Sequence, residues 1–307
     1  MRRLRFPKGV AEHVFEEKVR EHEFWYHSYY FDNGFEVRGD YDIGRNVEAY
    51  GFPDDMTGME VLDVGTGSGW FSFFFEQRGA RVTAVDARGY CDFDFVGRYE
   101  YPSLESEKPV PDRVGPGGEP LYDSPVSGGF WIMRDLLGSQ VQFVNSTVYG
   151  LSPELFGGKR FDLVFMGAVL PHVRDPIGAL MAARRVCGDR LIASTMMMPE
   201  WRALGELVRG PRVGAAVALA RRALRRTPLP EENPLPMMDL VHAMHDPIAW
   251  WRPNIACFRQ WFVTAGFSRV DVSRETTLTS DVLKPLDADA ERLRNVTKVL
   301  RVGDCRI

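Results

Sequence analysis

One stretch of the sequence, residues 60–70, constrains the fold more than any other. It reads Glu-Val-Leu-Asp-Val-Gly-Thr-Gly-Ser-Gly-Trp, an apolar run followed by three glycines at alternate positions. The apolar run is typical of a buried strand, and the aromatic run from Trp70 to Phe75 predicts one buried face of a helix. Strand, glycine turn and helix form the opening unit of a nucleotide-binding α/β sheet, where glycines let the backbone turn sharply and approach a ligand.

The glycine spacing and two acids indicate which ligand this unit binds. The pattern is G-x-G-x-G, whereas a dinucleotide fold carries G-x-G-x-x-G. Asp63 stands before the glycines, where a carboxylate would repel a pyrophosphate but suits the ammonium of a methionyl group. A second predicted strand, Arg81–Asp86, ends in an acid placed to accept hydrogen bonds from both ribose hydroxyls. These features favour S-adenosylmethionine over a phosphate-bearing cofactor; the alternative is an ordinary α/β turn without a ligand.

At these residues the chain resembles the class I S-adenosylmethionine-dependent methyltransferases. The resemblance implies a Rossmann-like sheet of seven mostly parallel strands with a late antiparallel strand. A third cofactor contact is expected at Ser146 and Thr147, where polar groups would meet the adenine edge. The alternative is a polar turn after a strand that contacts no ligand. The candidate cofactor-binding residues are Asp63, Gly65, Thr66, Gly67, Ser68, Gly69, Trp70, Asp86, Ala87, Ser146, Thr147, Met166 and Gly167.

Composition narrows the class of protein. The 307 residues suffice for one elaborated domain or two modest ones, and 45% hydrophobic residues provide a core. The net charge of −4 gives no general attraction to nucleic acid or to an anionic membrane. No apolar run reaches the length of a membrane span, the first residues lack a signal-peptide segment, and the four cysteines show no metal spacing. We therefore expect a cytoplasmic protein without a metal site.

Residues 1–58 precede the predicted strand and glycine turn, and we expect them to form a lid. Residues 11–23 have the spacing of an exposed amphipathic helix. Aromatic residues then flank an Asn-Gly turn over residues 24–38, which predicts a hairpin. Such aromatic density is typical of a core, but its position before the first strand also makes it a candidate lid over the cofactor. Tyr26 and Tyr29 are therefore candidate substrate-binding residues.

The candidate catalytic residue is His172. It follows a predicted strand, Phe161–Met166, and precedes a helix that we expect to begin with Asp175 as its N-cap. Ligands of open α/β sheets bind beyond the carboxyl ends of the strands, which places His172 beside the reacting centre. Its titration range suits a general base that takes a proton from the acceptor. The alternative is a histidine that only orders the loop or shapes the pocket.

Residues 199–245 interrupt the sheet and predict a cap over the acceptor. This insertion contains six arginines between positions 209 and 226, which favour a solvated helix face over a nucleic-acid patch. After it, a Trp-Arg-Pro-Asn sequence leads into a predicted helix over residues 255–265. Strands are expected over residues 269–273 and 297–302. The candidate substrate-binding residues are Tyr26, Tyr29, His172, Trp201, Trp251, Arg252 and Asn254.

A narrower resemblance covers roughly residues 24–98 and 128–275. The hairpin before the glycine turn, the Ser-Thr-Val-Tyr of residues 146–149, and the Trp-Arg-Pro-Asn segment resemble a subgroup that includes the transfer-RNA wobble-uridine carboxymethyltransferases. That chemistry needs a basic surface and a cation facing the carboxylate of carboxy-S-adenosylmethionine. The chain is acidic overall, and Arg252 is the best match to such a cation. Ordinary methyl transfer is favoured.

The resulting hypothesis is a methyltransferase whose acceptor is a small O, N or C nucleophile, natural-product-like or sugar-containing. The alternatives are transfer-RNA wobble-uridine (carboxy)methyl transfer and a non-catalytic cofactor-binding protein. The expected units are a lid over residues 1–58, an α/β domain over 59–198 and 246–307, and the cap over 199–245. Nucleic acid and membranes are not expected as partners, and a homodimer is left open.

Overall fold

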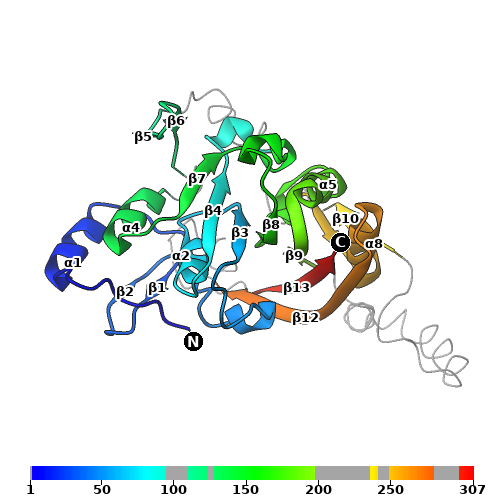
Figure 1. The fold of residues 1–307 in the computed structure, drawn as a ribbon. Coiled ribbons are helices and arrows are strands. Elements are labelled where there is room, and N and C mark those ends of the chain that lie inside the picture. The colour runs from blue at the N-terminus through cyan, green and yellow to red at the C-terminus, as the bar shows by residue number, and fades with distance from the viewer. Residues whose placement is uncertain (1, 95–109, 124–127, 198–235, 241–248, 280–296) are drawn as a thin grey trace, which may run out of the picture.

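A seven-stranded sheet forms the centre of the protein (Figure 1). The computed structural model describes residues 2–94, 110–123, 128–197, 236–240, 249–279 and 297–307. In spatial order the strands are β12 (Arg269–Thr279), β13 (Thr297–Arg306), β9 (Cys187–Met196), β8 (Phe161–Met166), β3 (Glu60–Val64), β4 (Arg81–Asp86) and β7 (Gln142–Asn145). The strands from β9 to β7 run parallel, and β13 is antiparallel to both of its neighbours. The predicted fold class is confirmed.

Successive side chains of a strand point to opposite faces of the sheet. Both faces are buried here, because other elements pack against each of them. On one face Val61 of β3 and Phe165 of β8 belong to a cluster that includes the aromatic helix α2 (Trp70–Glu76). On the other face Leu62 and Val64 of β3 belong to a second cluster. That cluster includes residues of α5 (Pro176–Val186) and α8 (Ile255–Thr264). The molecule therefore has three layers, with the parallel strands between two apolar cores.

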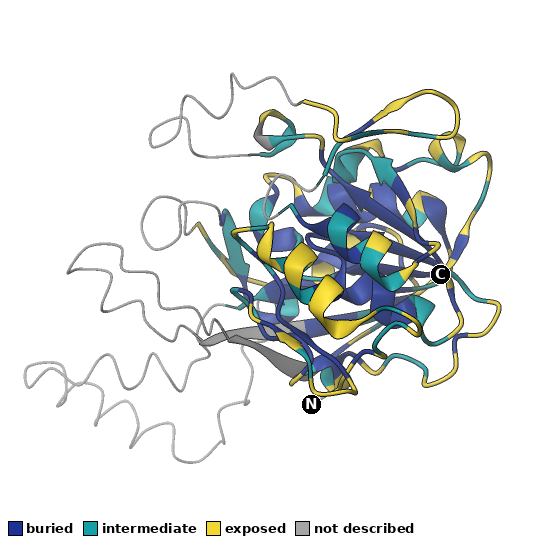
Figure 2. Cartoon of the chain, turned by 90° about the vertical axis from the view of Figure 1, so that its left-hand side faces the viewer, coloured by how far each residue is buried: buried dark blue, intermediate teal, exposed yellow. Residues whose placement is uncertain are grey.

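The N-terminal segment packs on the α2 side of the sheet. Its elements are α1 (Glu12–Arg20), β1 (Tyr29–Tyr30), β2 (Glu36–Val37) and a 3₁₀ turn, η1 (Val47–Tyr50). The predicted hairpin is present, with Tyr29 paired to Val37. Its residues Trp25, Tyr29 and Phe31 are buried in the first cluster, so the core interpretation is correct for these three. Among the residues of α1 only Phe15 is fully buried, and Figure 2, which faces this side, shows exposed helix surfaces over a buried interior.

The remaining elements follow the expected order, and they differ from the prediction in the length of the last two strands and in a strand within the predicted cap. The short elements are η2 (Tyr90–Asp92), β5 (Arg113–Val114), β6 (Pro120–Leu121), α4 (Phe130–Leu137), η3 (Val148–Gly150), η4 (Glu154–Phe156), η5 (Leu170–His172), β10 (Met238–Leu240) and β11 (Trp251–Pro253). The stretch between β4 and α4 contains η2 and the small β5–β6 hairpin. Strands β12 and β13 are longer than expected, because each pairs with the other along its length. Most of the predicted cap lies outside the described residues, but β10, inside it, pairs with β11. No helix among the described residues has the length and apolarity needed to cross a membrane.

Candidate functional site

The sheet reverses its order of growth between β3 and β8. From β3 the chain adds β4 and then β7 on one side, and from β8 it adds β9 on the other. β3 and β8 are adjacent, with Leu62 paired to Val164. In open α/β sheets, ligands bind at such a switch point, beyond the carboxyl ends of the strands. The segments that leave these two ends, residues 65–69 and 167–172, therefore define the candidate site.

The glycine turn after β3 is enclosed by two other segments. Gly65 and Gly67 have positive φ angles of 73° and 54°, which residues other than glycine rarely adopt. A Cβ atom on Gly65 would lie 2.6 Å from Val169 Cγ2, in the segment after β8. A Cβ atom on Gly67 would lie 3.2 Å from His27 Cε1 and 3.3 Å from Tyr26 Cδ1, in the N-terminal segment. The turn therefore needs glycine both for its backbone and for its contacts.

Asp63 holds the glycine turn against α2. Its side chain is 1% exposed and lies on the α2 face of the sheet. Its Oδ2 accepts hydrogen bonds from Thr66 Oγ1 at 3.0 Å and Ser72 Oγ at 2.6 Å. Burial raises the pKa of Asp63 to about 6, against the opposing effect of these bonds. Its described contacts fix the turn, and the contact predicted with a methionyl ammonium stays a prediction.

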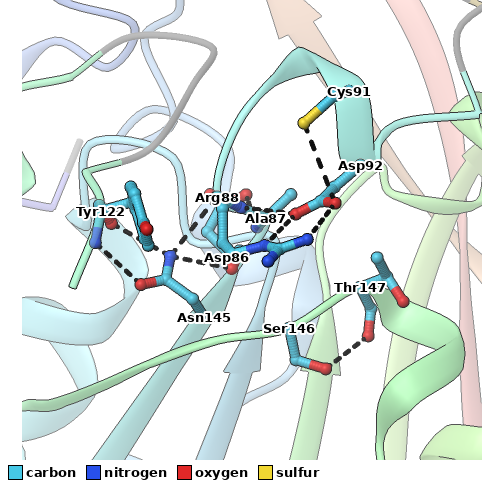
Figure 3. Close-up of polar contacts among 9 residues, drawn as sticks. All are labelled: Asp86, Ala87, Arg88, Cys91, Asp92, Tyr122, Asn145, Ser146 and Thr147. Atoms are coloured by element: carbon cyan, nitrogen blue, oxygen red, sulfur yellow. Dashed lines mark hydrogen bonds and ion pairs between the residues drawn. The ribbon is translucent and has the colours of Figure 1, made fainter. Parts of the chain in front are cut away.

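Asp86, which Figure 3 shows at the end of β4, bonds to the glycine turn. The carboxylate is 5% exposed, and its two oxygens accept from Gly67 N at 3.0 Å and Ala87 N at 2.8 Å. Ser146 N, at the end of β7, donates to the Asp86 carbonyl at 3.0 Å. The structure thus brings together three of the four segments in which cofactor-binding residues were predicted, the fourth being residues 166–167 at the end of β8. The two amides fix the orientation of the carboxylate.

Asn145, at the end of β7, makes contacts that the sequence did not predict. Its Oδ1 accepts from Tyr122 N at 2.8 Å, and its Nδ2 donates to the Tyr122 carbonyl at 3.1 Å. Figure 3 shows the Asn145 side chain between Tyr122 and the backbone of Asp86 and Ala87. It ties the segment after β6 to the end of β4. The only signal for it in the sequence is an amide residue at the end of a predicted strand.

The segment after β8 contains a residue with a left-handed backbone. Ala168 has a φ of 55°, and it is the one residue other than glycine with a positive φ in the described part of the chain. Its N donates to Ser194 Oγ at 3.0 Å, and Ser194 Oγ lies 3.1 Å from the hydroxyl of the buried Tyr50. Burial raises the pKa of Tyr50 to about 12, so this hydroxyl stays protonated. Sequence reasoning did not identify this group, because alanine carries no signal for a left-handed backbone.

His172 ends the 3₁₀ turn η5. Its side chain is partly buried, and its N donates to the Val169 carbonyl at 2.9 Å. Val169 is the residue that approaches Gly65, so η5 lies beside the glycine turn. This agrees with the expected position of His172 at the carboxyl end of β8. Its role as a general base stays a prediction.

An anchor made of Asp94, Tyr149, Arg174 and Trp250 holds η5 in place. The carboxylate of Asp94 accepts from Arg174 N at 2.8 Å, from Arg174 Nε at 2.9 Å and from the Tyr149 hydroxyl. The Asp94 carbonyl accepts from Trp250 Nε1 at 2.6 Å, and Trp250 N donates to the Pro171 carbonyl at 2.7 Å. Four segments far apart in the sequence therefore meet beside η5. Sequence reasoning missed Asp94, which lies in a stretch without any regular pattern.

The predicted substrate-binding residues have mixed surroundings. The buried Tyr29 hydroxyl donates to the Ser68 carbonyl, so this side chain supports the glycine turn. Asn254 is the N-cap of α8, and its Oδ1 accepts from Cys257 N at 2.8 Å and Met237 N at 3.1 Å. Through these contacts Tyr29 and Asn254 have structural roles. Their predicted contacts with a substrate stay predictions.

The other described candidates, Tyr26, Trp251 and Arg252, also have partners within the protein, and their contacts with a substrate stay predictions. Tyr26 is partly buried and packs against Tyr41 with ring centroids 4.9 Å apart. Trp251 Nε1 donates to the Arg174 carbonyl at 2.9 Å, and Arg252 pairs with Asp239 across the β10–β11 hairpin at 2.6 Å. Trp201 lies outside the described residues.

Comparisons with known proteins identify the family. A crystal structure of the N-terminal domain of EvdMO1 with SAH bound has a TM-score of 0.53 and 14% identity, and 97% of each chain is covered. The same domain in the presence of SAH and D-fucose gives a TM-score of 0.53, 15% identity and the same coverage. At these identities the likeness concerns the fold alone. Residues 36–213 match the model of a family described as a methyltransferase domain. The chain belongs to this methyltransferase domain family.

This membership confirms the predictions of a class I S-adenosylmethionine-dependent methyltransferase and of its cofactor. It does not extend to the wobble-uridine subgroup, and no curated protein sequence matches the chain. The residues at the switch point fit the cofactor. Gly65 and Gly67 let the turn pass close to the two segments that enclose it, and Asp86 offers an oriented carboxylate beside them.

Proposed function

We propose that this methyltransferase transfers the methyl group of S-adenosylmethionine to a small-molecule O, N or C nucleophile. One observation carries the proposal. The glycine turn has the segment after β8 against Gly65 and the N-terminal segment against Gly67. A donor on this turn would therefore lie between two protein segments, which suits a compact acceptor and the exclusion of water.

Each residue of the donor side has a defined task in this proposal. The Asp86 carboxylate, oriented by Gly67 N and Ala87 N, accepts hydrogen bonds from the ribose hydroxyls. Ser146 and Thr147, at the end of β7, meet the adenine edge. The backbone of Gly65 and Gly67 lies along the donor. The bound cofactor supplies an electrophilic methyl on a sulfonium, which needs no activation by the protein.

The acceptor side orients the nucleophile and, where the nucleophile carries a proton, removes it. His172 takes that proton as the methyl group leaves the donor, and the anchor of Asp94 fixes the segment that carries it. Good orientation alone supplies effective molarities of about 10⁵ M or more in well-aligned systems. Most of the rate enhancement is therefore assigned to alignment.

Charge supports a small acceptor over a nucleic acid. The net charge of −4 disfavours a polyanion, since nucleic-acid binding depends on neutralising several phosphates. The N-terminal domain of EvdMO1 was crystallised in the presence of SAH and D-fucose, so hexoses are reasonable first probes.

Two measurements test the proposal. Calorimetry should give saturable binding of S-adenosylmethionine and S-adenosylhomocysteine by the full chain. Release of S-adenosylhomocysteine is then followed with panels of hexoses, phenols and amines, and with bulk transfer RNA as the competing acceptor. Methylation or carboxymethylation of transfer RNA at ordinary salt would contradict the small-molecule assignment, and failure to bind the donor would contradict the site.

A further inference from the structure

His27 is fixed against the glycine turn by its backbone. It precedes β1, and its N donates to Ser68 Oγ at 3.2 Å. A Cβ atom on Gly39 would lie 2.5 Å from the His27 carbonyl, so the hairpin backbone packs tightly around this residue. The residue is 5% exposed. Its position is therefore set by the fold before any ligand binds.

The imidazole of His27 has a buried nitrogen without a partner. Nδ1 makes no hydrogen bond to any of the described residues, including the two aromatic rings beside it. Those rings belong to Tyr26, at 4.9 Å between centroids, and Phe71, at 6.5 Å. Burial lowers the pKa of His27 to about 3, so the ring is neutral and carries one N–H donor and one acceptor nitrogen. A buried polar group without a partner is rare and points to a ligand or a function.

The ring of His27 lies beside the glycine turn and beside Phe71, which packs against β8. Its Cε1 and Nε2 lie 3.2 Å and 3.8 Å from the position of a Cβ on Gly67. Phe71, beside it, packs on Phe165 of β8 with ring centroids 4.4 Å apart. The groups proposed for ribose and adenine (Figure 3) instead lie at the ends of β4 and β7, which are on the other side of β3 from β8. His27 is therefore close to the half of the donor that carries the sulfur.

The amino-acid end of the donor needs polar partners in this region. Asp63, predicted for the ammonium, uses its Oδ2 for Thr66 and Ser72 and is 1% exposed. A neutral imidazole can donate to a carboxylate or accept from an ammonium without adding charge beside the sulfonium. We infer that His27 is a donor-binding residue whose imidazole hydrogen-bonds the amino-acid group of S-adenosylmethionine. This inference rests on the proposed function, because it assumes the same site.

The test compares two ligands that share the adenosine part. S-adenosylhomocysteine carries the amino-acid group, and 5′-methylthioadenosine lacks it. His27→Ala removes the ring, His27→Phe keeps its packing but removes both nitrogens, and His22→Ala is the control in the same segment. Calorimetry should give a loss of S-adenosylhomocysteine affinity of roughly tenfold to a hundredfold in both His27 variants. Affinity for 5′-methylthioadenosine should change less than about twofold, and His22→Ala should match the parent for both ligands.

Thermal unfolding of each variant accompanies the titrations, and His27→Phe decides the result if His27→Ala is poorly folded. The inference is overturned if S-adenosylhomocysteine binds the folded His27→Phe variant as tightly as the parent. It is also overturned if both ligands lose affinity equally, because the ring would then act through the shape of the turn. A parent protein that fails to bind S-adenosylhomocysteine would instead remove the proposed function itself.

Discussion

The two sides that we propose for the site, one for the donor and one for the acceptor, are built in different ways. On the donor side, at the ends of β3, β4 and β7, Asp63 bonds to residues three and nine positions away, and Asp86 to Gly67 nineteen positions away. On the acceptor side, at the ends of β8 and β9, Tyr50 meets Ser194 across 144 positions and Asp94 meets Trp250 across 156. One local β-α-β unit therefore makes most of the donor side, whereas the acceptor side exists only once distant segments have packed.

The acceptor side also keeps buried polar atoms without hydrogen-bond partners among the described residues. Thr195 Oγ1, at the end of β9, and Arg252 Nε, on β11, are both of this kind. The buried acids of the donor side, Asp63 and Asp86, accept bonds from neighbours in the turn and the strand end. Buried groups without partners are unfavourable for stability, so they are expected where a protein has been shaped for a ligand. Such atoms therefore occur on both sides, at His27 Nδ1 beside the glycine turn and at Thr195 and Arg252 on the acceptor side, whereas the buried acids of the donor side are satisfied within the protein.

The largest effect should come from His172, which tests whether the acceptor side does chemistry. His172→Asn should lower turnover by about 10²–10⁴-fold, the typical contribution of a general base. The affinity for S-adenosylmethionine should stay within about twofold of the parent, because the substitution leaves the glycine turn intact. Turnover and calorimetry check these two values, and His13→Asn on the exposed surface of α1 is the matched control.

A large loss of donor affinity in His172→Asn would contradict this division between the two sides. His172 would then shape the pocket wall through Val169 and Gly65 and would not exchange protons with the acceptor.

Much of the donor side could be predicted from sequence, for a physical reason. The glycine spacing and the acids of residues 63 and 86 are local consequences of one backbone path, so they leave a readable pattern. The strands β3, β4 and β8 and the helix N-cap Asp175 were predicted at their observed positions. Alternation of apolar residues and capping chemistry act over a few residues and need no tertiary information.

The parts that could not be predicted depend on tertiary contacts. No local rule marks Ala168 for a positive φ, since that angle is held by Ser194 from the neighbouring strand. Asp94 lies in a stretch without periodicity and gains its role only from Arg174 and Trp250. Asn254 was predicted to bind substrate, but its amide oxygen caps α8 and accepts from Met237.

A second effect concerns the titration of Asp63 on the donor side. Its folded pKa of about 6 lies above the ordinary value of 3.8, so between pH 4 and 6 the folded state binds more protons than the unfolded state. The free energy of unfolding should therefore fall as the pH rises through this window, by about 3 kcal/mol at most. Denaturant unfolding of the parent and of Asp63→Asn at pH 4, 5 and 6 measures this contribution.

The Asp63→Asn variant has no titrating group at this position, so it should lack this component of the pH dependence. As the pH rises from 4 to 6, the free energy of unfolding of the parent should therefore fall relative to that of the variant. Parallel pH profiles for the two proteins would mean that Asp63 is ionised throughout, and that Thr66 and Ser72 outweigh its burial.

The third effect tests the joint between β4 and the glycine turn. Asp86→Ala should weaken binding of S-adenosylmethionine by roughly 1.5–3 kcal/mol, because charge-assisted hydrogen bonds to ribose are lost. Arg88→Ala is a suitable control, since it breaks the neighbouring exposed ion pair with Asp92 and leaves Asp86 in place. If calorimetry gives equal affinities for the parent and Asp86→Ala, the Asp86 carboxylate does not bind the ribose hydroxyls.

The smallest effect distinguishes strain from ordinary packing on the acceptor side. Ala168→Gly should relieve a left-handed conformation that costs an L residue about 1–2 kcal/mol. Glycine also gives the unfolded chain more freedom, which offsets about 0.4–1 kcal/mol of that gain. The free energy of unfolding should therefore rise by up to about 1 kcal/mol, whereas Ala256→Gly within α8 should lower it by up to about that amount. The hydrogen bond from residue 168 to Ser194 uses the backbone N and survives the change. If Ala168→Gly destabilises the protein as much as Ala256→Gly, the positive φ carries no strain, and the acceptor side is then as relaxed as the donor side.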